Sequence, residues 1–190
     1  MAFMTLKFNK KDIITIPNLL SFFRIVLIPV IVVLYCNYKM YSATTLVILI
    51  SGLTDIVDGF IARKFHMISD FGKILDPISD KLTQASILLC LFTRFPHMIY
   101  LFALMAIKET LMGVTGLLSI RKSGEVHGAD WHGKLTTCVL YAMLLVHIVW
   151  HDITLHVSDM LLTFVACAML FSLIMYVMRN VHVIQEHKEQ

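Results

Sequence analysis

The stretch that decides the fold runs from residue 55 to residue 80: DIVDGFIAR at 55–63, eight further residues, then GKILDPISD at 72–80. It carries four aspartates within otherwise apolar sequence: Asp55, Asp58, Asp76 and Asp80. One carboxylate at the centre of a membrane-spanning helix costs roughly 2.5 to 3.5 kcal/mol on insertion scales, so four isolated ones would cost on the order of 10 kcal/mol. Something cationic or aqueous must therefore compensate these charges.

The rest of the chain is typical of an integral membrane protein. Its 190 residues are 58% hydrophobic and 15% charged, with a mean hydropathy of +0.78, far more apolar than a soluble domain. We expect an all-α membrane protein, residues 1–190 forming one domain, with a short amphipathic segment at 1–16. Six apolar segments near the length that spans a bilayer follow it: 18–37, 42–63, 72–92, 96–120, 133–150 and 155–179.

The distribution of basic residues predicts the orientation. The net charge of +3 does not indicate a nucleic-acid partner, because in a membrane protein the position of Lys and Arg matters more than their sum. One set of predicted helix ends carries almost all of them, and the other carries only Lys39 and Arg94. Six spans then place both termini in the cytoplasm. They also place the aspartates at the cytoplasmic ends of the second and third helices, in a multi-pass protein of the cell membrane.

The spacing of the aspartates predicts a metal site. Asp55 and Asp58 are three residues apart, and Asp76 and Asp80 are four apart, so each pair shares one helical face. The short connection between the two helices predicts a hairpin on which the faces converge. Carboxylate oxygens without His or thiolate suit Mg²⁺ or Mn²⁺. Four of them are enough for two ions, an arrangement that clamps phosphate groups during displacement at phosphorus.

The neighbouring residues fit a phosphate-bearing ligand. Gly59 and Ala62 remove bulk, Arg63 offers a forked cation, and Gly72 begins the third helix where the chain turns back. The alternative is a hairpin of paired charges without chemistry, which we disfavour because so many acids lack enough internal cations. Arg24 either serves the metal cavity or merely pairs there. A second alternative, a divalent-cation transporter, predicts carboxylates spread through the membrane depth, whereas these cluster at one depth.

The run is identified as the signature of the CDP-alcohol phosphotransferase family, Asp-x2-Asp-Gly-x2-Ala-Arg-x8-Gly-x3-Asp-x3-Asp, matched at every fixed position. The resemblance implies transfer of a substituted phosphoryl group from a CDP-linked donor to an alcohol, with release of CMP. It implies that all four aspartates bind the metals and that Asp80 is also the general base. It further implies a homodimer and a CDP site formed by five residues: Asp58, Gly59, Ala62, Arg63 and Gly72.

Three further stretches resemble bacterial phosphatidylglycerophosphate synthases: IPNLLSFFRIVLIP at 16–29, LDPISDK at 75–81 and WHGKLTT at 131–137. This resemblance implies CDP-diacylglycerol and sn-glycerol 3-phosphate as substrates, drawn from the membrane lipid and the cytoplasm. Related cardiolipin synthases share parts of these stretches and remain an alternative. The chain departs from the pattern at Lys108-Glu109, where these synthases carry Arg-Glu. Lys keeps the charge but loses the bidentate fork.

A phosphorylated acceptor needs cations near the metals. The candidates on the predicted cytoplasmic half are Lys134, Arg121 and Lys108. The first two also satisfy the ordinary bias of basic residues toward cytoplasmic helix ends. Lys108 and Glu109 lie deep in a predicted span, where an ionisable pair is a functional candidate by default. A structural pair with neighbouring helices is the competing interpretation.

Overall fold

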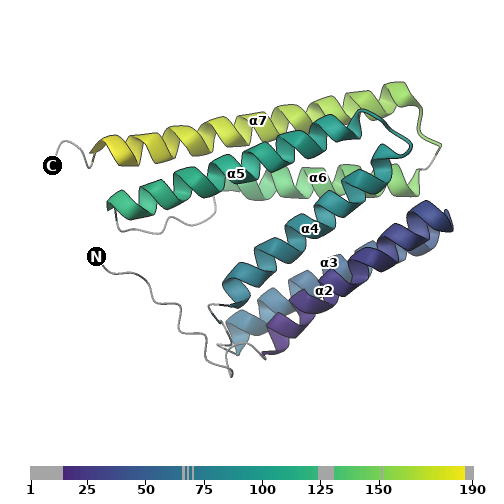
Figure 1. Cartoon of the computed structure of the whole chain (residues 1–190), viewed down its shortest axis with the longest axis horizontal. Coiled ribbons are helices and arrows are strands. Elements are labelled where there is room, and N and C mark those ends of the chain that lie inside the picture. The colour runs from purple at the N-terminus through teal and green to yellow at the C-terminus, as the bar shows by residue number, and fades with distance from the viewer. Residues whose placement is uncertain are drawn as a thin grey trace. The chain divides into compact units, whose positions relative to one another are not determined.

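The computed structural model describes residues 15–65, 67, 69, 71–123, 131–150 and 152–186. These residues form helices and no strand (Figure 1), which confirms the all-α prediction. In chain order the helices are α2 (Ile16–Val32), the π-helix η1 (Val33–Asn37), α3 (Tyr41–Lys64), α4 (Gly72–Phe92), α5 (Met98–Ser123), α6 (Trp131–Val149) and α7 (Leu155–Glu186). The predicted amphipathic segment falls almost wholly on residues 1–14, outside the described residues.

Four stretches of helix are long and apolar enough to cross a membrane: Ile16–Asn37, Tyr41–Lys64, Met98–Thr115 and Leu155–Arg179. The chain is therefore a multi-pass membrane protein. The two other predicted spans, 72–92 and 133–150, do not meet the same requirements of length and hydropathy. The apolar part of α6, Gly133–Val149, is only 17 residues long. Helix α4 carries two aspartates and is less apolar than the other α-helices that the structure describes. Their passage through the membrane stays a prediction, as does the orientation of the termini.

The chain divides into two compact units, Met1–Cys90 and Leu91–Gln190. In the first unit α2 packs along α3. The hydroxyl of Thr15 caps α2 by accepting from the backbone N–H of Asn18 at 3.4 Å, and Pro17 occupies the first turn, where a missing N–H is harmless. The organisation of residues 1–190 as one domain remains a prediction.

The face that α2 buries is unusually polar for an apolar helix. Pro17, Ser21, Arg24 and Ile31 are all buried, and their spacing of four, three and seven residues returns to the same side of a helix. Large apolar residues such as Leu19 and Phe22 occupy the opposite side and are more than half exposed. Helix α2 thus presents a serine and an arginine toward the hairpin of α3 and α4.

The turn between α3 and α4 brings the two aspartate-bearing segments together. Helix α3 ends at Lys64, where the N–H of Phe65 donates to the carbonyl of Ile61 at 3.0 Å. Ser69 then receives the N–H of Gly72 on its hydroxyl oxygen at 3.0 Å, which fixes the start of α4. The hairpin predicted from the sequence is therefore tied at its base by a side chain of the turn.

In the second unit α5 and α6 both pack on α7. Its apolar core includes Leu101, Leu140 and Leu144, each about 1% exposed. His147 is equally buried, with its Nε2 at 2.9 Å from the hydroxyl of Ser158 and its Nδ1 at 2.8 Å from the carbonyl oxygen of Met143. Satisfying both ring nitrogens makes this polar group tolerable inside an apolar helix bundle.

Candidate metal and nucleotide site

The centre of the site is the guanidinium of Arg24, which reaches from α2 to all four aspartates. Its Nη1 lies 2.5 Å from Asp55 Oδ1 and also pairs with Asp80, while its Nη2 lies 3.0 Å from Asp58 Oδ2 and also pairs with Asp76. The side chain of Arg24 is only 2% exposed. One buried cation therefore joins the carboxylates of α3 and α4.

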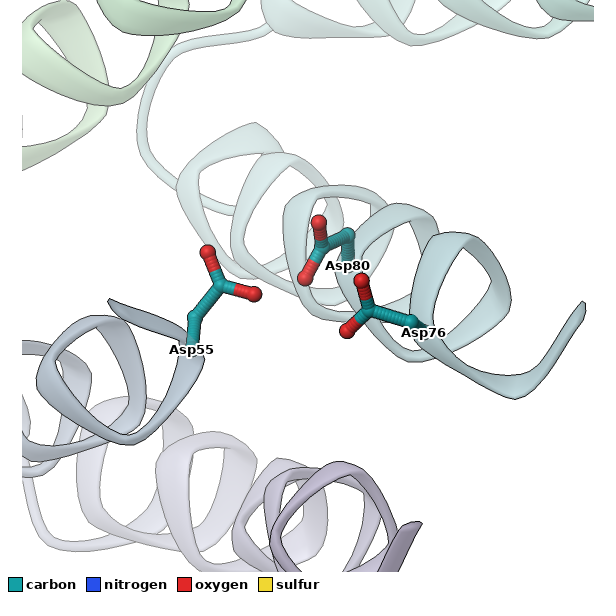
Figure 2. Close-up of side chains that lie close together, drawn as sticks. All are labelled: Asp55, Asp76 and Asp80. Carbon is teal, nitrogen blue, oxygen red and sulfur yellow. The ribbon is translucent and has the colours of Figure 1, made fainter. Parts of the chain in front are cut away.

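Three of the aspartates form a compact set of oxygen donors. Asp55 projects from α3 toward Asp76 and Asp80, which lie one turn apart on α4 (Figure 2). One carboxylate oxygen from each of the three lies within 4.8 Å of the others. Asp58 lies deeper, about 4% exposed, and accepts a hydrogen bond from the hydroxyl of Ser21 at 3.3 Å. The convergence predicted from the spacing is thus present, with Asp58 on the buried side.

The charge of this cluster fits a divalent cation. Four carboxylates and one guanidinium leave a formal charge of about −3 if every carboxylate is ionised. Asp55, Asp76 and Asp80 keep 28–46% of their side-chain surface exposed, so an ion can reach them. Oxygen donors of this kind, without sulfur or imidazole, are those that Mg²⁺ and Mn²⁺ prefer. The aspartate cluster can therefore bind a divalent metal ion.

A cavity of about 220 Å³ lies directly beside the aspartates. The five residues predicted to bind CDP all line it: Asp58, Gly59, Ala62, Arg63 and Gly72. It is smaller than the roughly 300–1,000 Å³ of pockets that enclose a whole drug-sized ligand. It therefore has room for only part of a ligand of that size.

Sequence reasoning missed three polar residues of the cavity: Asn18, Ser21 and Ser69. The Asn18 amide donates to the Ser69 hydroxyl at 3.0 Å, and the same hydroxyl stands 3.2 Å from Asn18 Oδ1. Both residues are less than a tenth exposed. The signal for the two α2 residues was available, because buried polar residues at helical spacing in an apolar helix indicate an internal polar site.

The two glycines of the signature have different roles. A Cβ at Gly72 would lie 2.4 Å from Asn18 Oδ1 and 3.0 Å from the Ser69 hydroxyl oxygen, so a larger residue at position 72 would have to displace the Asn18 amide. A Cβ at Gly59 would meet only the Arg63 guanidinium, at 3.6 Å, an ordinary contact. The lack of a side chain at Gly59 therefore leaves space beside the Arg63 guanidinium.

The three candidates for the acceptor phosphate belong to the second unit. Lys108 is 3% exposed, and its ammonium lies 3.2 Å from the carboxylate of Glu109. Lys134 is exposed near the start of α6. Arg121 lies on α5, but its side chain is outside the described residues. Their proximity to the aspartates, and their contact with an acceptor, stay predictions.

Comparison with known proteins adds a family match over most of the chain. Residues 14–178 match the family model of CDP-alcohol phosphatidyltransferase. The CDP-diacylglycerol–glycerol-3-phosphate 3-phosphatidyltransferase of Escherichia coli (strain K12) is 30% identical over 170 residues, covering 85% of this chain and 92% of that protein. The enzyme of the same name from Rickettsia typhi is 37% identical over 81 residues, covering 42% of this chain and 46% of that protein.

A fungal relative covers a shorter part. The cardiolipin synthase (CMP-forming) / mitochondrial hydrolase fusion protein of Schizosaccharomyces pombe is 42% identical over 85 residues, which is 45% of this chain and 14% of that protein. The chain thus spans less than half the length of this relative and of the Rickettsia one. The strong local identity and the long match to the Escherichia coli protein point to one family.

Proposed function

The chain belongs to the CDP-alcohol phosphatidyltransferase family, and we propose that it transfers the phosphatidyl group of CDP-diacylglycerol to sn-glycerol 3-phosphate. The products are phosphatidylglycerophosphate and CMP. The observation that carries this proposal is the meeting of four aspartates on Arg24 beside a cavity that Arg63, Asp58 and Asp76 help to line. The choice of acceptor is supported by the name of the Escherichia coli relative, which the chain matches over 92% of that protein's length.

The proposed cofactor is Mg²⁺ or Mn²⁺, with two ions in the site. Asp55, Asp76 and Asp80 would hold them through converging oxygens, with Asp58 supplying a further carboxylate. Bound there, the ions would stabilise negative charge on the phosphates and on the CMP leaving group. A cluster with an excess of about three negative charges is strongly attractive to such ions.

The remaining steps belong to side chains of the site. The cavity beside Asp58 would receive the cytidine and phosphates of the donor, with Arg63 contacting phosphate oxygens through its planar fork. Asp80 would accept the proton of the acceptor hydroxyl as that oxygen attacks the phosphatidyl phosphorus. We propose direct attack, with Lys134, Arg121 and Lys108 as candidate contacts for the phosphate of the acceptor.

The membrane arrangement follows the same reasoning. We propose six spans in the cell membrane, with both termini and the aspartates on the cytoplasmic side, because a soluble nucleotide product has to leave from there. The asymmetric distribution of basic residues supports this orientation. A homodimer is proposed from the family resemblance alone.

A second candidate function is the synthesis of cardiolipin from phosphatidylglycerol. It is favoured by the 42% identity to the Schizosaccharomyces pombe protein named for that activity. The two proposals share a donor and a metal site, and they differ only in the alcohol.

An acceptor assay separates the two functions. Purified protein in detergent is mixed with CDP-diacylglycerol, Mg²⁺ and either labelled glycerol 3-phosphate or labelled phosphatidylglycerol, and the lipid product and CMP are measured. We expect product with glycerol 3-phosphate and none with phosphatidylglycerol. The reverse result would replace the first function by the second. If neither acceptor gives a lipid product but another labelled alcohol does, the acceptor is that alcohol; no CMP release with any alcohol tested would refute the transferase.

A further inference from the structure

We propose that Arg24 is an exchangeable counter-ion: its guanidinium neutralises the aspartates while no metal is bound, and divalent ions displace it when they bind. This inference rests on the metal site of the proposed function. It goes beyond that site by assigning a role to a residue outside the family signature. Arg24 would set how tightly the site holds its metal and how stable the protein is without it.

The first support is the position of the guanidinium. Figure 2 shows the carboxylates of Asp55, Asp76 and Asp80 facing one another, and Arg24 forms ion pairs with all three and with Asp58. Metal ligands must approach one ion closely, and here they converge on the two terminal nitrogens of an arginine. The same carboxylate oxygens cannot fully serve the guanidinium and an ion together.

The second support is that the arginine is imperfectly satisfied. Its Nε is buried and has no hydrogen-bond partner, although a buried N–H normally has one. Arg24 also reaches Ser21, whose hydroxyl oxygen lies 3.4 Å from Nη2, so part of the guanidinium already has a polar neighbour outside the cluster. The attraction of four carboxylates, and not an ideal set of hydrogen bonds, keeps the side chain in place.

The third support is the charge balance. Four ionised aspartates carry a formal charge of about −4, and two divalent ions would cancel it completely. Retaining the guanidinium beside two divalent ions would leave the buried site positive, with like charges in close contact. Without metal, removing Arg24 would leave four carboxylates without their shared cation, the buried Asp58 among them, which is destabilising. Exchange of the guanidinium for divalent ions keeps the charge of the aspartates balanced both without and with bound metal.

The experiment compares wild type with Arg24→Gln, which keeps a polar side chain and removes the charge. Arg94→Gln is the matched control, because Arg94 is 36% exposed and pairs with the exposed Asp152 at 3.5 Å. Each protein is purified in detergent with Mg²⁺ and stripped with EDTA. Mn²⁺ binding is then measured by the loss of the free-ion paramagnetic resonance signal, and thermal unfolding is followed with and without Mn²⁺. Neither readout depends on catalysis.

We expect Arg24→Gln to bind Mn²⁺ at least about tenfold more tightly than wild type, since the ion no longer competes with an internal cation. Its metal-free melting temperature should fall by roughly 5–10 °C, and Mn²⁺ should restore it to that of loaded wild type. Arg94→Gln should match wild type in both measurements. Equal or weaker Mn²⁺ binding by Arg24→Gln would overturn the inference while leaving the metal site of the proposed function intact.

Wild type that binds no Mn²⁺ would overturn both the inference and the metal-dependent function, so the two failures are distinguishable. If Arg24→Gln does not fold, the wild-type protein alone decides. A structure of it with Mn²⁺, located by its anomalous signal, should show the Arg24 nitrogens out of ion-pair contact with Asp55, Asp76 and Asp80. A guanidinium still paired with all three beside the bound ions would refute the exchange.

Discussion

The contact between α2 and α4 makes Gly72→Ala a sharp test of the site. The added Cβ would lie 2.4 Å from Asn18 Oδ1 and 3.0 Å from the Ser69 hydroxyl oxygen. Asn18 is 4% exposed and hydrogen-bonded to Ser69, so it cannot swing aside freely. It must turn into the cavity that it lines, or α2 and α4 must separate. Either movement alters the proposed nucleotide site.

The magnitude follows from three contributions. Overpacking costs roughly 1–3 kcal/mol, and breaking the Asn18–Ser69 hydrogen bonds costs about 1 kcal/mol more. The better helix propensity of alanine returns less than about 1 kcal/mol at the first residue of a helix. We expect a net loss of roughly 1–3 kcal/mol. For a chain of this size this lowers the melting temperature by on the order of 3–10 °C.

The assay is thermal unfolding in detergent together with CMP binding by calorimetry. Gly52→Ala is the matched control, because a Cβ at that helical glycine of α3 would meet nothing within 4 Å. It should leave stability unchanged or raise it by up to about 1 kcal/mol. Gly72→Ala should also weaken CMP binding roughly tenfold, equivalent to about 1.4 kcal/mol.

A double-mutant cycle with Asn18→Ala isolates the clash. With the amide removed, Gly72→Ala should cost less by roughly 0.5–3 kcal/mol, the range for residues in direct contact. Equal melting temperatures for Gly72→Ala and Gly52→Ala would contradict the expected clash. So would an equal loss of stability from Gly72→Ala in proteins with and without the Asn18 side chain.

Three further predictions concern other parts of the chain. Asp80→Asn should lower the rate of CMP release by about 10²–10⁴-fold at saturating Mg²⁺, since the proposed base is lost. The control Asp159→Asn, which changes an exposed aspartate of α7, should leave that rate unchanged. Near-normal CMP release by Asp80→Asn would exclude Asp80 as the base. His147→Leu orphans the Ser158 hydroxyl and should destabilise by about 2 kcal/mol in thermal unfolding. Adding Ser158→Ala should recover part of this loss, and an unchanged melting temperature would contradict the assignment. Lys134→Ala should raise KM for glycerol 3-phosphate at least about tenfold without changing KM for CDP-diacylglycerol; equal changes in both would exclude a phosphate contact.

The helices were largely predictable because apolar runs end at turn residues. The segment predicted at 72–92 is the helix Gly72–Phe92. The last segment was predicted to end at residue 179, whereas α7 continues to Glu186. Hydropathy reports where a span ends, but a helix continues into water as long as its backbone hydrogen bonds are supported. The segment predicted at 96–120 is helix α5, which begins two residues later at Met98, because Pro96 and His97 form a turn before it.

The convergence of the carboxylates could be predicted from the sequence, but most of the polar contacts around them could not. Spacing alone brings Asp76 and Asp80 onto one face of α4, and the short turn aligns this face with α3. No local pattern predicts that Asn18 bonds to Ser69, 51 residues away, because the pairing depends on the packing of α2 against the hairpin. The sequence left open whether Arg24 serves the metal cavity or merely pairs there, and its contact with all four aspartates required the structure.

The ion pairs of Arg24 also have a consequence for biosynthesis. Asp55 follows Arg24 by 31 residues and Asp80 by 56, so a ribosome delivers the arginine to the membrane long before its partners exist. Even at the centre of a helix, an unpaired arginine costs only about 2.5 to 3.5 kcal/mol on insertion scales. The stretch that carries Arg24, Ile16–Asn37, has the highest mean hydropathy, 2.5, of the four candidate spans found among the described residues. Helix α2 can therefore insert into the membrane before the aspartates that pair with Arg24 have been synthesised. Assembly of this unit is then ordered in time, because a nascent chain that ends before α4 contains only two of the four carboxylates that pair with Arg24, those of Asp55 and Asp58.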